Sequence, residues 1–192
     1  VKSYKTMDGQ RAATVTLANV VVAEDQLLNA VGEGMDLVDQ VMPSMLMALS
    51  AEALGIMSTL NSITVDYSKT RQQFGAPIGS FQVLQHRMVD TFMACEQAKS
   101  MLYRSLCQAN ECAADDAVDT TEFMKSVHAL KVTMAKAGKQ IGEEAIQLHG
   151  GIGLTDELNI GHFVKRLMTI NVTLGDRDFH QKKFNQLSYS AS

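Results

Sequence analysis

Apolar side chains recur every three or four residues along three long segments of this 192-residue chain. This spacing places them on one face of a helix, and such a face must be buried against a neighbour. Each segment would form a helix of roughly 30 residues, and short connections make successive helices antiparallel. The pattern therefore predicts an all-α up-down helical bundle. The three stripes are Val38, Met42, Met45, Leu49, Ile56, Leu60 and Ile63; Phe81, Leu84, Met88, Phe92, Cys95, Leu102 and Leu106; and Phe123, Val127, Leu130, Met134, Ala137, Ile141, Ala145 and Leu148.

Side chains that favour helix starts follow the expected breaks in the chain. Ser80 and Thr155 are residue types preferred at an N-cap, where the side-chain oxygen accepts from a backbone N–H. Asp119 with Glu122 three residues later resembles a capping box. These signals place helix starts near Ser80, Asp119 and Thr155.

Glycine and proline mark the remaining helix boundaries. Pro43 would kink the first helix or mark its first turn. The glycines within 150–153 would end the third long helix. Two shorter helices are expected after it, at about 155–168 and about 176–187.

Residues 1–33 differ from the helical part that follows at 34–192. Residues 12–22 are rich in β-branched side chains, which favours a strand, and Asp8-Gly9 before them is a turn signal. A strand or hairpin alone cannot bury a face. The segment must therefore pair with the helices or with sequence outside this chain. Because residue 1 is valine, we expect that the sequence starts inside a longer protein or has been processed.

Charge and composition exclude several classes of function. The net charge is −4 and the isoelectric point is about 5.7, which argues against partners such as nucleic acid or an anionic membrane. No uninterrupted apolar run approaches the roughly 18 residues that span a bilayer. The first residues show no basic region followed by an apolar run, so no signal peptide is expected. Three cysteines without CxxC spacing indicate reduced thiols. The five histidines lack metal-ligand spacing, so no metal site is expected.

Two breaks between the long helices carry glycine beside polar residues. Residues 71–75 follow the first helix and begin with Arg71, and residues 147–153 end the third. Glycine lets backbone amides approach a ligand closely, and an arginine can pair with phosphate. Either break alone would usually be a simple helix end.

The two breaks extend into longer motifs. The first reads Arg71-x-x-Phe74-Gly75-x-Pro77-Ile78 with Phe81, Gln82 and Gln85, and the second reads Gln147-x-His149-Gly150-Gly151-x-Gly153. Together these motifs resemble two signatures of the acyl-CoA dehydrogenase family. The family's order of strands before a helical bundle is also similar, so that residues 1–33 resemble the end of its middle β-domain and residues 34–192 its C-terminal domain.

The resemblance implies an FAD cofactor at a subunit interface. Arg71 would contact the flavin pyrophosphate across the dimer, and Phe74 would pack near the adenosine. Gln147, Gly150 and Gly151 would line the cofactor of the partner subunit. His149 stands where relatives carry Phe or His, which indicates packing rather than catalysis.

The resemblance also implies a carboxylate base, which abstracts the proton α to the thioester. Many relatives carry a Glu at the position of Gly175, and here the nearest carboxylate is Asp176. Asp176 is therefore the candidate catalytic residue, with an N-cap of the last helix as the alternative role.

Other relatives carry the base on the first long helix, and some carry an Arg there that contacts CoA. These two positions fall near Met45 and Leu46, so neither group is retained. Glu52 on the same helix is expected to be a structural ion-pair partner.

The Gly-Asp-x-Asp-x-His pattern at 175–180 is similar to short subunits of bacterial heteromeric acyl-CoA dehydrogenases of fatty acid or steroid degradation. The resemblance thus implies a cytoplasmic bacterial flavoprotein that oxidises an acyl-CoA substrate to the 2-enoyl-CoA and passes electrons to an acceptor. It would assemble as a homodimer, a homotetramer or a heterotetramer with a sister subunit. The alternative is a non-catalytic scaffold that completes the FAD site of a base-bearing sister subunit. We expect this chain alone to be inactive.

Overall fold

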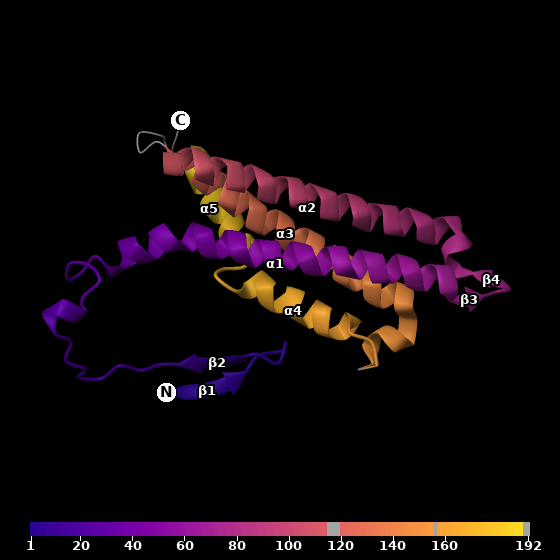
Figure 1. Ribbon diagram of the computed structural model, residues 1–192, viewed down its shortest axis with the longest axis horizontal. Coiled ribbons are helices and arrows are strands. Elements are labelled where there is room, and N and C mark those ends of the chain that lie inside the picture. Colours follow the sequence, from indigo (N-terminus) through magenta and orange to yellow (C-terminus); the bar gives the residue numbers. More distant parts are fainter. Residues whose placement is uncertain (115–119, 156, 190–192) are drawn as a thin grey trace.

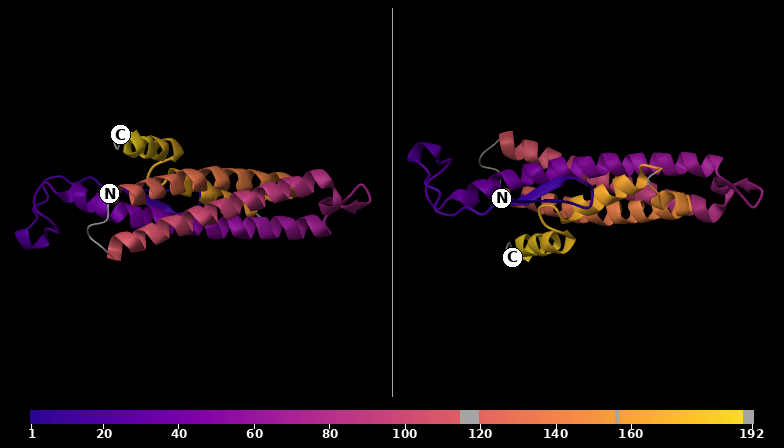
Figure 2. Two further views of the ribbon diagram at one scale, coloured as in Figure 1. Left: turned by 90° about the horizontal axis from the view of Figure 1, so that it is seen from above. Right: turned by 90° about the horizontal axis from the view of Figure 1, so that it is seen from below.

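The computed structural model describes residues 1–114, 120–155 and 157–189 and consists mainly of helices. Three long helices run side by side, each antiparallel to the next in sequence, and two shorter helices pack beside them (Figures 1 and 2). The predicted all-α bundle is therefore confirmed. The helices are α1 (Gly34–Thr70), α2 (Gln82–Ala114), α3 (Thr120–His149), α4 (Ile160–Val172) and α5 (Arg177–Tyr189).

Helix α3 forms the centre of the bundle. It contributes 14 buried residues, against nine from α1 and five from α2, because it packs against every other long or short helix. Leu46, Met57 and Leu60 of α1 are fully buried, as is Leu130 of α3. Burial of these apolar stripes is the main stabilising contribution to such a fold.

Some of the expected helix boundaries are wrong. Ser80 belongs to a short 3₁₀ turn, η2 (Ile78–Ser80), and its hydroxyl donates to Pro77 O at 2.6 Å instead of capping α2. Thr155 likewise donates to Ile152 O at 2.9 Å, and α4 begins only at Ile160. Hydroxyls near a turn can bond the preceding backbone, which competes with capping. The expected capping residue Asp119 lies outside the described residues.

Pro43 lies inside α1 and not in its first turn, so that alternative is wrong, and a kink at Pro43 stays a prediction. The residue is buried, and α1 is continuous from Gly34 to Thr70. A helix interior tolerates proline only at the loss of one backbone hydrogen bond, which packing in the bundle offsets.

The N-terminal segment forms a hairpin, shorter than the sequence suggested. Strand β1 (Lys2–Lys5) pairs antiparallel with β2 (Arg11–Thr14) across the predicted turn. The expected strand over 12–22 ends at Thr14, because no strand in the described part of the chain lies beside residues 15–22, which are exposed. A short 3₁₀ turn, η1 (Glu24–Gln26), interrupts the exposed path to α1.

Arg166 of α4 fixes this hairpin to the bundle. Its guanidinium contacts Asp8 at 2.8 Å and clamps both carboxylate oxygens of Glu52, at 2.6 and 2.8 Å. A hydrogen bond from Thr6 and the contact with Arg166 lower the pKa of Asp8. The prediction that Glu52 is an ion-pair partner is therefore confirmed, although its side chain is partly exposed.

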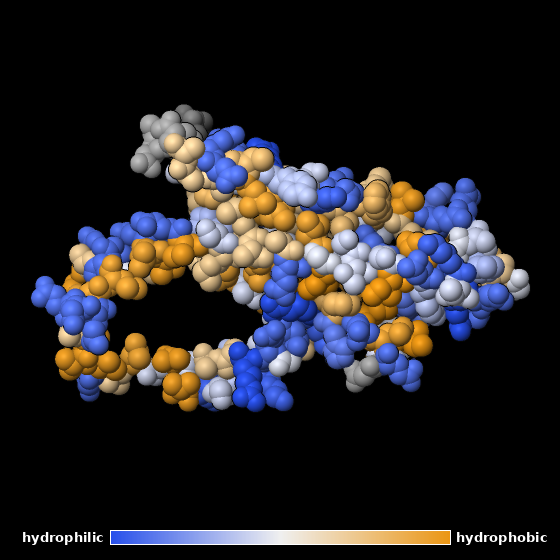
Figure 3. All heavy atoms as spheres, in the orientation of Figure 1, coloured by the Kyte–Doolittle hydropathy of each residue, from blue (hydrophilic) through white to orange (hydrophobic). Residues whose placement is uncertain are grey.

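Apolar side chains gather on the exposed N-terminal path and the first turns of α1 (Figure 3). Within the described ranges, α1 is the one helix long and apolar enough to cross a membrane by length and composition. The core helix of a bundle has the same character, and α1 packs its buried side chains against α3 and α2.

Candidate functional site

The first signature forms a tight turn at the end of α1. Arg71 is the C-cap of α1, and strands β3 (Gln72–Gln73) and β4 (Ala76–Pro77) then form a small hairpin. Phe74 at its tip is 94% exposed and has a φ of +54°, followed by Gly75 at +83°. The exposed Arg71 guanidinium forms no ion pair within the described part of the chain. Both signature side chains are thus free to meet a ligand or a partner.

Gly79 and Gln85 explain why this turn lies against α1. A Cβ on Gly79 would be 2.8 Å from Ser68 Oγ and 3.0 Å from Ser68 O, so only glycine permits the approach. The side-chain amide of Gln85 donates to Gly79 O at 2.8 Å. These contacts fix the direction in which α2 leaves the turn.

The second signature ends α3 with an exposed backbone. Gly150 has a φ of +65°, and a 3₁₀ turn, η3 (Gly150–Leu154), follows. A Cβ built on Gly150 or Gly151 would meet no atom within 4 Å, so both lie open to solvent. Gln147 is also exposed. Open glycine backbone beside a polar side chain suits the close approach of a ligand.

Tyr67 and His149 join the two signatures at one end of the bundle. Their rings stack with centroids 4.2 Å apart, and the Tyr67 hydroxyl lies 3.5 Å from His149 O. His149 is buried and donates from Nδ1 to Ala145 O at 2.8 Å, and its burial lowers the pKa of the ring. Segments about 75 residues apart in sequence thus lie at the same end of the bundle.

The turn at residues 173–176, between α4 and α5, is closed to a side chain at position 175. Gly175 has a φ of +105°, and a Cβ there would be 2.5 Å from Phe179 Cδ1 and 2.9 Å from His180 Nε2. This is the position where the resemblance places the Glu of many relatives. The sequence alone showed that the Glu is absent, but not that side chains of α5, Phe179 and His180, occupy its place.

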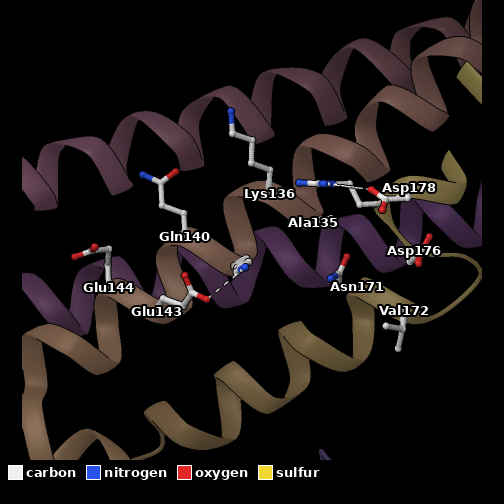
Figure 4. A pocket seen from close by; sticks show the side chains of 11 residues that line it. Ala135, Lys136, Gln140, Glu143, Glu144, Asn171, Val172, Asp176 and Asp178 are labelled. Carbon is white, nitrogen blue, oxygen red and sulfur yellow. Dashed lines mark hydrogen bonds and ion pairs between the residues drawn. The ribbon is translucent and has the colours of Figure 1, made fainter. Parts of the chain in front are cut away.

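Asp176 caps α5 at the rim of a polar cleft. Its Oδ1 accepts from the backbone N–H of Phe179 at 2.8 Å, so the expected N-cap contact is present. The cleft has a volume of about 540 Å³ and lies between α3 and the α4–α5 turn (Figure 4). In Figure 4 Asp176 lies at one end and Glu144 at the other. A role of Asp176 as a base stays a prediction.

We expect Asp176→Ala to lower the free energy of unfolding by about 1 kcal/mol, because it removes the N-cap acceptor. Asp176→Asn retains an acceptor oxygen, so its stability should stay within a few tenths of a kcal/mol of wild type. Urea unfolding of both variants measures the difference. Equal losses in both would contradict the capping role.

The two positions on α1 that carry functional groups in some relatives hold none here. Met45 is 50% exposed and Leu46 is fully buried in the core. A thioether cannot abstract a proton, and the buried Leu46 cannot reach a ligand. Neither side chain substitutes for the missing carboxylate or arginine.

Sequence patterns gave no sign of a buried polar cluster beneath the 173–176 turn. His128 and Lys131 of α3 and His180 of α5 are all buried, at 7%, 1% and 1% exposure. The Nδ1 atoms of the two histidines lie 2.9 Å apart. His128 and Lys131 stand next to the apolar stripe of α3, but lysine is rarely fully buried unless it is paired, so this placement did not predict burial.

The buried histidine pair predicts a loss of stability in mild acid. Burial, then His180 and Lys183, lower the pKa of His128 to about 4 from an ordinary value of 6.5. Between these values the unfolded chain binds a proton that the folded chain does not, so stability falls as the pH drops from about 6.5 towards 4. The loss should reach about 3 kcal/mol at most, at about 1.4 kcal/mol per pKa unit.

Urea midpoints from pH 8 to pH 4 measure this loss. His128→Leu should flatten the dependence, whereas His86→Gln, at an exposed histidine, should leave it unchanged. A wild-type midpoint that is constant over this range would contradict the prediction.

Among the described residues, no group of three or more His, Cys, Asp or Glu side chains could hold a metal ion. The groups available for chemistry are therefore the backbone of two exposed glycine turns, the Arg71 guanidinium and the carboxylates of the polar cleft.

Residues 32–183 match the acyl-CoA dehydrogenase C-terminal domain. The chain belongs to the acyl-CoA dehydrogenase family. Acyl-CoA dehydrogenase IpdE2 of Mycolicibacterium smegmatis is 35% identical over 118 residues, which cover 62% of this chain and 34% of that protein.

Two solved structures share the fold of this chain. An FAD complex of PigA superposes with a TM-score of 0.81 at 24% identity, over 91% of this chain and 44% of that one. The ChsE4-ChsE5 complex of Mycobacterium tuberculosis superposes with a TM-score of 0.85 at 18% identity, and the match covers 96% of this chain and 47% of that one. This chain therefore spans about a third to a half of the length of the proteins it matches.

Proposed function

We propose that this chain is the C-terminal part of an acyl-CoA dehydrogenase subunit that takes part in the flavin-dependent oxidation of an acyl-CoA thioester to the 2-enoyl-CoA. One observation carries the proposal: Tyr67 stacks on His149 and brings both family signatures to one end of the bundle. Family membership and the fold shared with an FAD complex support it.

The residues at this end of the bundle fit a flavin dinucleotide. Arg71 offers an exposed guanidinium that has no ion-pair partner among the described residues. A guanidinium can bind phosphate oxygens in two parallel hydrogen bonds. Gly150 and Gly151 offer open backbone, and Phe74 offers an exposed ring for stacking. Bound flavin would supply the hydride acceptor. Arg71 and Phe74 would serve the cofactor across the dimer, and Gln147 with the glycines would line that of the partner subunit.

We expect Arg71→Ala to weaken FAD binding by the full-length protein by about 10- to 100-fold, since a charged hydrogen bond contributes about 1.5–3 kcal/mol. Stability without flavin should be unchanged because the side chain is exposed. Arg104→Ala, at an exposed arginine of α2, is the matched control. Flavin fluorescence titration measures the affinity, and equal affinities for both variants would contradict the proposal.

The closed turn at Gly175 favours a second candidate function, that of a scaffold subunit. Proton abstraction needs a carboxylate within hydrogen-bond reach of the substrate carbon. No side chain fits at position 175, and position 45 holds a methionine. A sister subunit would then supply the base while this chain completes the FAD site. The name of the ChsE4-ChsE5 complex indicates two different subunits in a protein of this fold.

Assays of the full-length protein distinguish the two candidates. Formation of 2-enoyl-CoA by the protein alone, abolished by Asp176→Asn, would identify Asp176 as the base. Formation only in the presence of a sister subunit, insensitive to Asp176→Asn, would identify a scaffold. An electron-transfer acceptor must be supplied in both assays. The 192-residue chain alone should neither turn over nor hold stoichiometric FAD.

We further propose a reducing, cytoplasmic location for the protein. Cys95, Cys107 and Cys112 are all free thiols, and their positions on α2 leave them unpaired with one another. Thiol titration of the protein under non-reducing conditions should find three reactive groups after unfolding.

A further inference from the structure

Buried side chains donate to the carbonyl groups at the end of α4. Lys131 Nζ donates to Ile170 O and, at 2.9 Å, to Thr173 O. His180 Nε2 lies 3.0 Å from Leu174 O. The last carbonyl groups of a helix have no partner within the helix, so donors from α3 and α5 satisfy groups that would otherwise be unpaired. The end of α4 is thus held from two neighbouring helices.

The acceptor at Leu174 fixes the protonation pattern of the histidine pair. A carbonyl oxygen only accepts, so His180 must donate from Nε2. In its neutral form His180 then accepts at Nδ1, and the proton between the rings belongs to His128 Nδ1, 2.9 Å away. His128 therefore orients His180, and His180 binds the turn.

The 173–176 turn has a conformation that requires such support. Leu174 has a φ of +60° and Gly175 one of +105°, and positive φ is strained for a leucine. Strained residues persist only where their surroundings over-determine them. Here Lys131 donates to Thr173, the residue before the strained Leu174, His180 donates to Leu174 itself, and Asp176 caps the helix that follows.

We propose that Lys131, His180 and, through His180, His128 are positioning residues that hold the 173–176 turn in its strained conformation. They keep Asp176 at the rim of the polar cleft, and His180, together with Phe179, leaves no space for a side chain at position 175. The importance of this turn for catalysis rests on the proposed function, whereas its geometry does not. Amide hydrogen exchange in this turn therefore tests the proposal whether or not the protein binds flavin or substrate.

Amide hydrogen exchange of the full-length protein tests the proposal. His180→Leu removes the donor at similar volume and should speed exchange in residues 173–180 about five- to tenfold, while α1 and α2 stay unchanged. His180→Gln, which retains a donor at a comparable position, should restore most of the protection. Lys131→Met should speed exchange in the same segment. Unchanged exchange in 173–180, or an equal increase in every helix, would overturn the proposal.

The protonation pattern can be measured without any substitution, by ¹⁵N NMR of the histidine rings near neutral pH. We expect a proton on Nε2 of His180 and on Nδ1 of His128. An unprotonated Nε2 on His180 would overturn the proposal, because Leu174 O could not then accept a hydrogen bond from it.

Discussion

Gly175→Glu should lower the free energy of unfolding by about 2–6 kcal/mol and should not create a working base. The backbone contributes about 1–3 kcal/mol, because φ at this position is +105°. Overpacking contributes a further 1–3 kcal/mol, because the new Cβ would lie 2.5 Å from Phe179 Cδ1 and 2.9 Å from His180 Nε2. Restoring the carboxylate that many relatives carry at this position would therefore damage the turn that must hold it.

Alanine substitutions at two other glycines separate the backbone contribution from the overpacking contribution. Gly9→Ala places a side chain at a φ of +82° with no atom within 4 Å, so it reports the backbone term alone. Gly55 lies in α1, without a positive φ and with no atom within 4 Å of an added Cβ. Gly55→Ala should therefore be neutral or slightly stabilising, since alanine favours helices. Urea unfolding measures all three. If Gly175→Glu lowers the free energy of unfolding no more than Gly9→Ala does, then Phe179 and His180 move aside and overpacking does not contribute.

Leu130→Ala should destabilise the protein by about 2–5 kcal/mol. Leu130 is fully buried in α3, the helix that packs against all the others, so the cavity would open where the helices meet. Close packing on several sides also limits how far the neighbours can relax into that cavity.

Leu154→Ala is the matched control, because the same substitution falls on a side chain that is 74% exposed. Its effect should be within about 0.5 kcal/mol of zero. Thermal or urea unfolding of both variants provides the comparison. Equal effects would mean that α3 is not the centre of the folded chain.

The bundle could be predicted because its cause is local. Residues such as Leu60 and Leu130 lie on stripes whose period matches the helix, and burial of a stripe needs little information beyond that period. The same holds for the signature turns, where Gly75 and Gly150 adopt the positive φ that glycine favours.

Helix starts and the N-terminal strand could be predicted only in part. Ser80 and Thr155 have the right chemistry for an N-cap, yet each hydroxyl bonds a carbonyl three residues earlier. The β-branched run continues to residue 22, but the strand ends at Thr14 because β1 offers no further partner. In each case a competing or missing backbone partner decided the outcome.

By itself the sequence determined the helical stripes, the two signatures and the absence of a Glu at position 175, since all three follow from residue types and spacing along the chain. Only the tertiary structure decided that Tyr67 joins the signatures through His149, and that Phe179 and His180 close position 175. It alone placed Lys131 and the histidine pair beneath that turn. These contacts join residues on different helices, and their distances depend on how the helices pack, which no local period specifies.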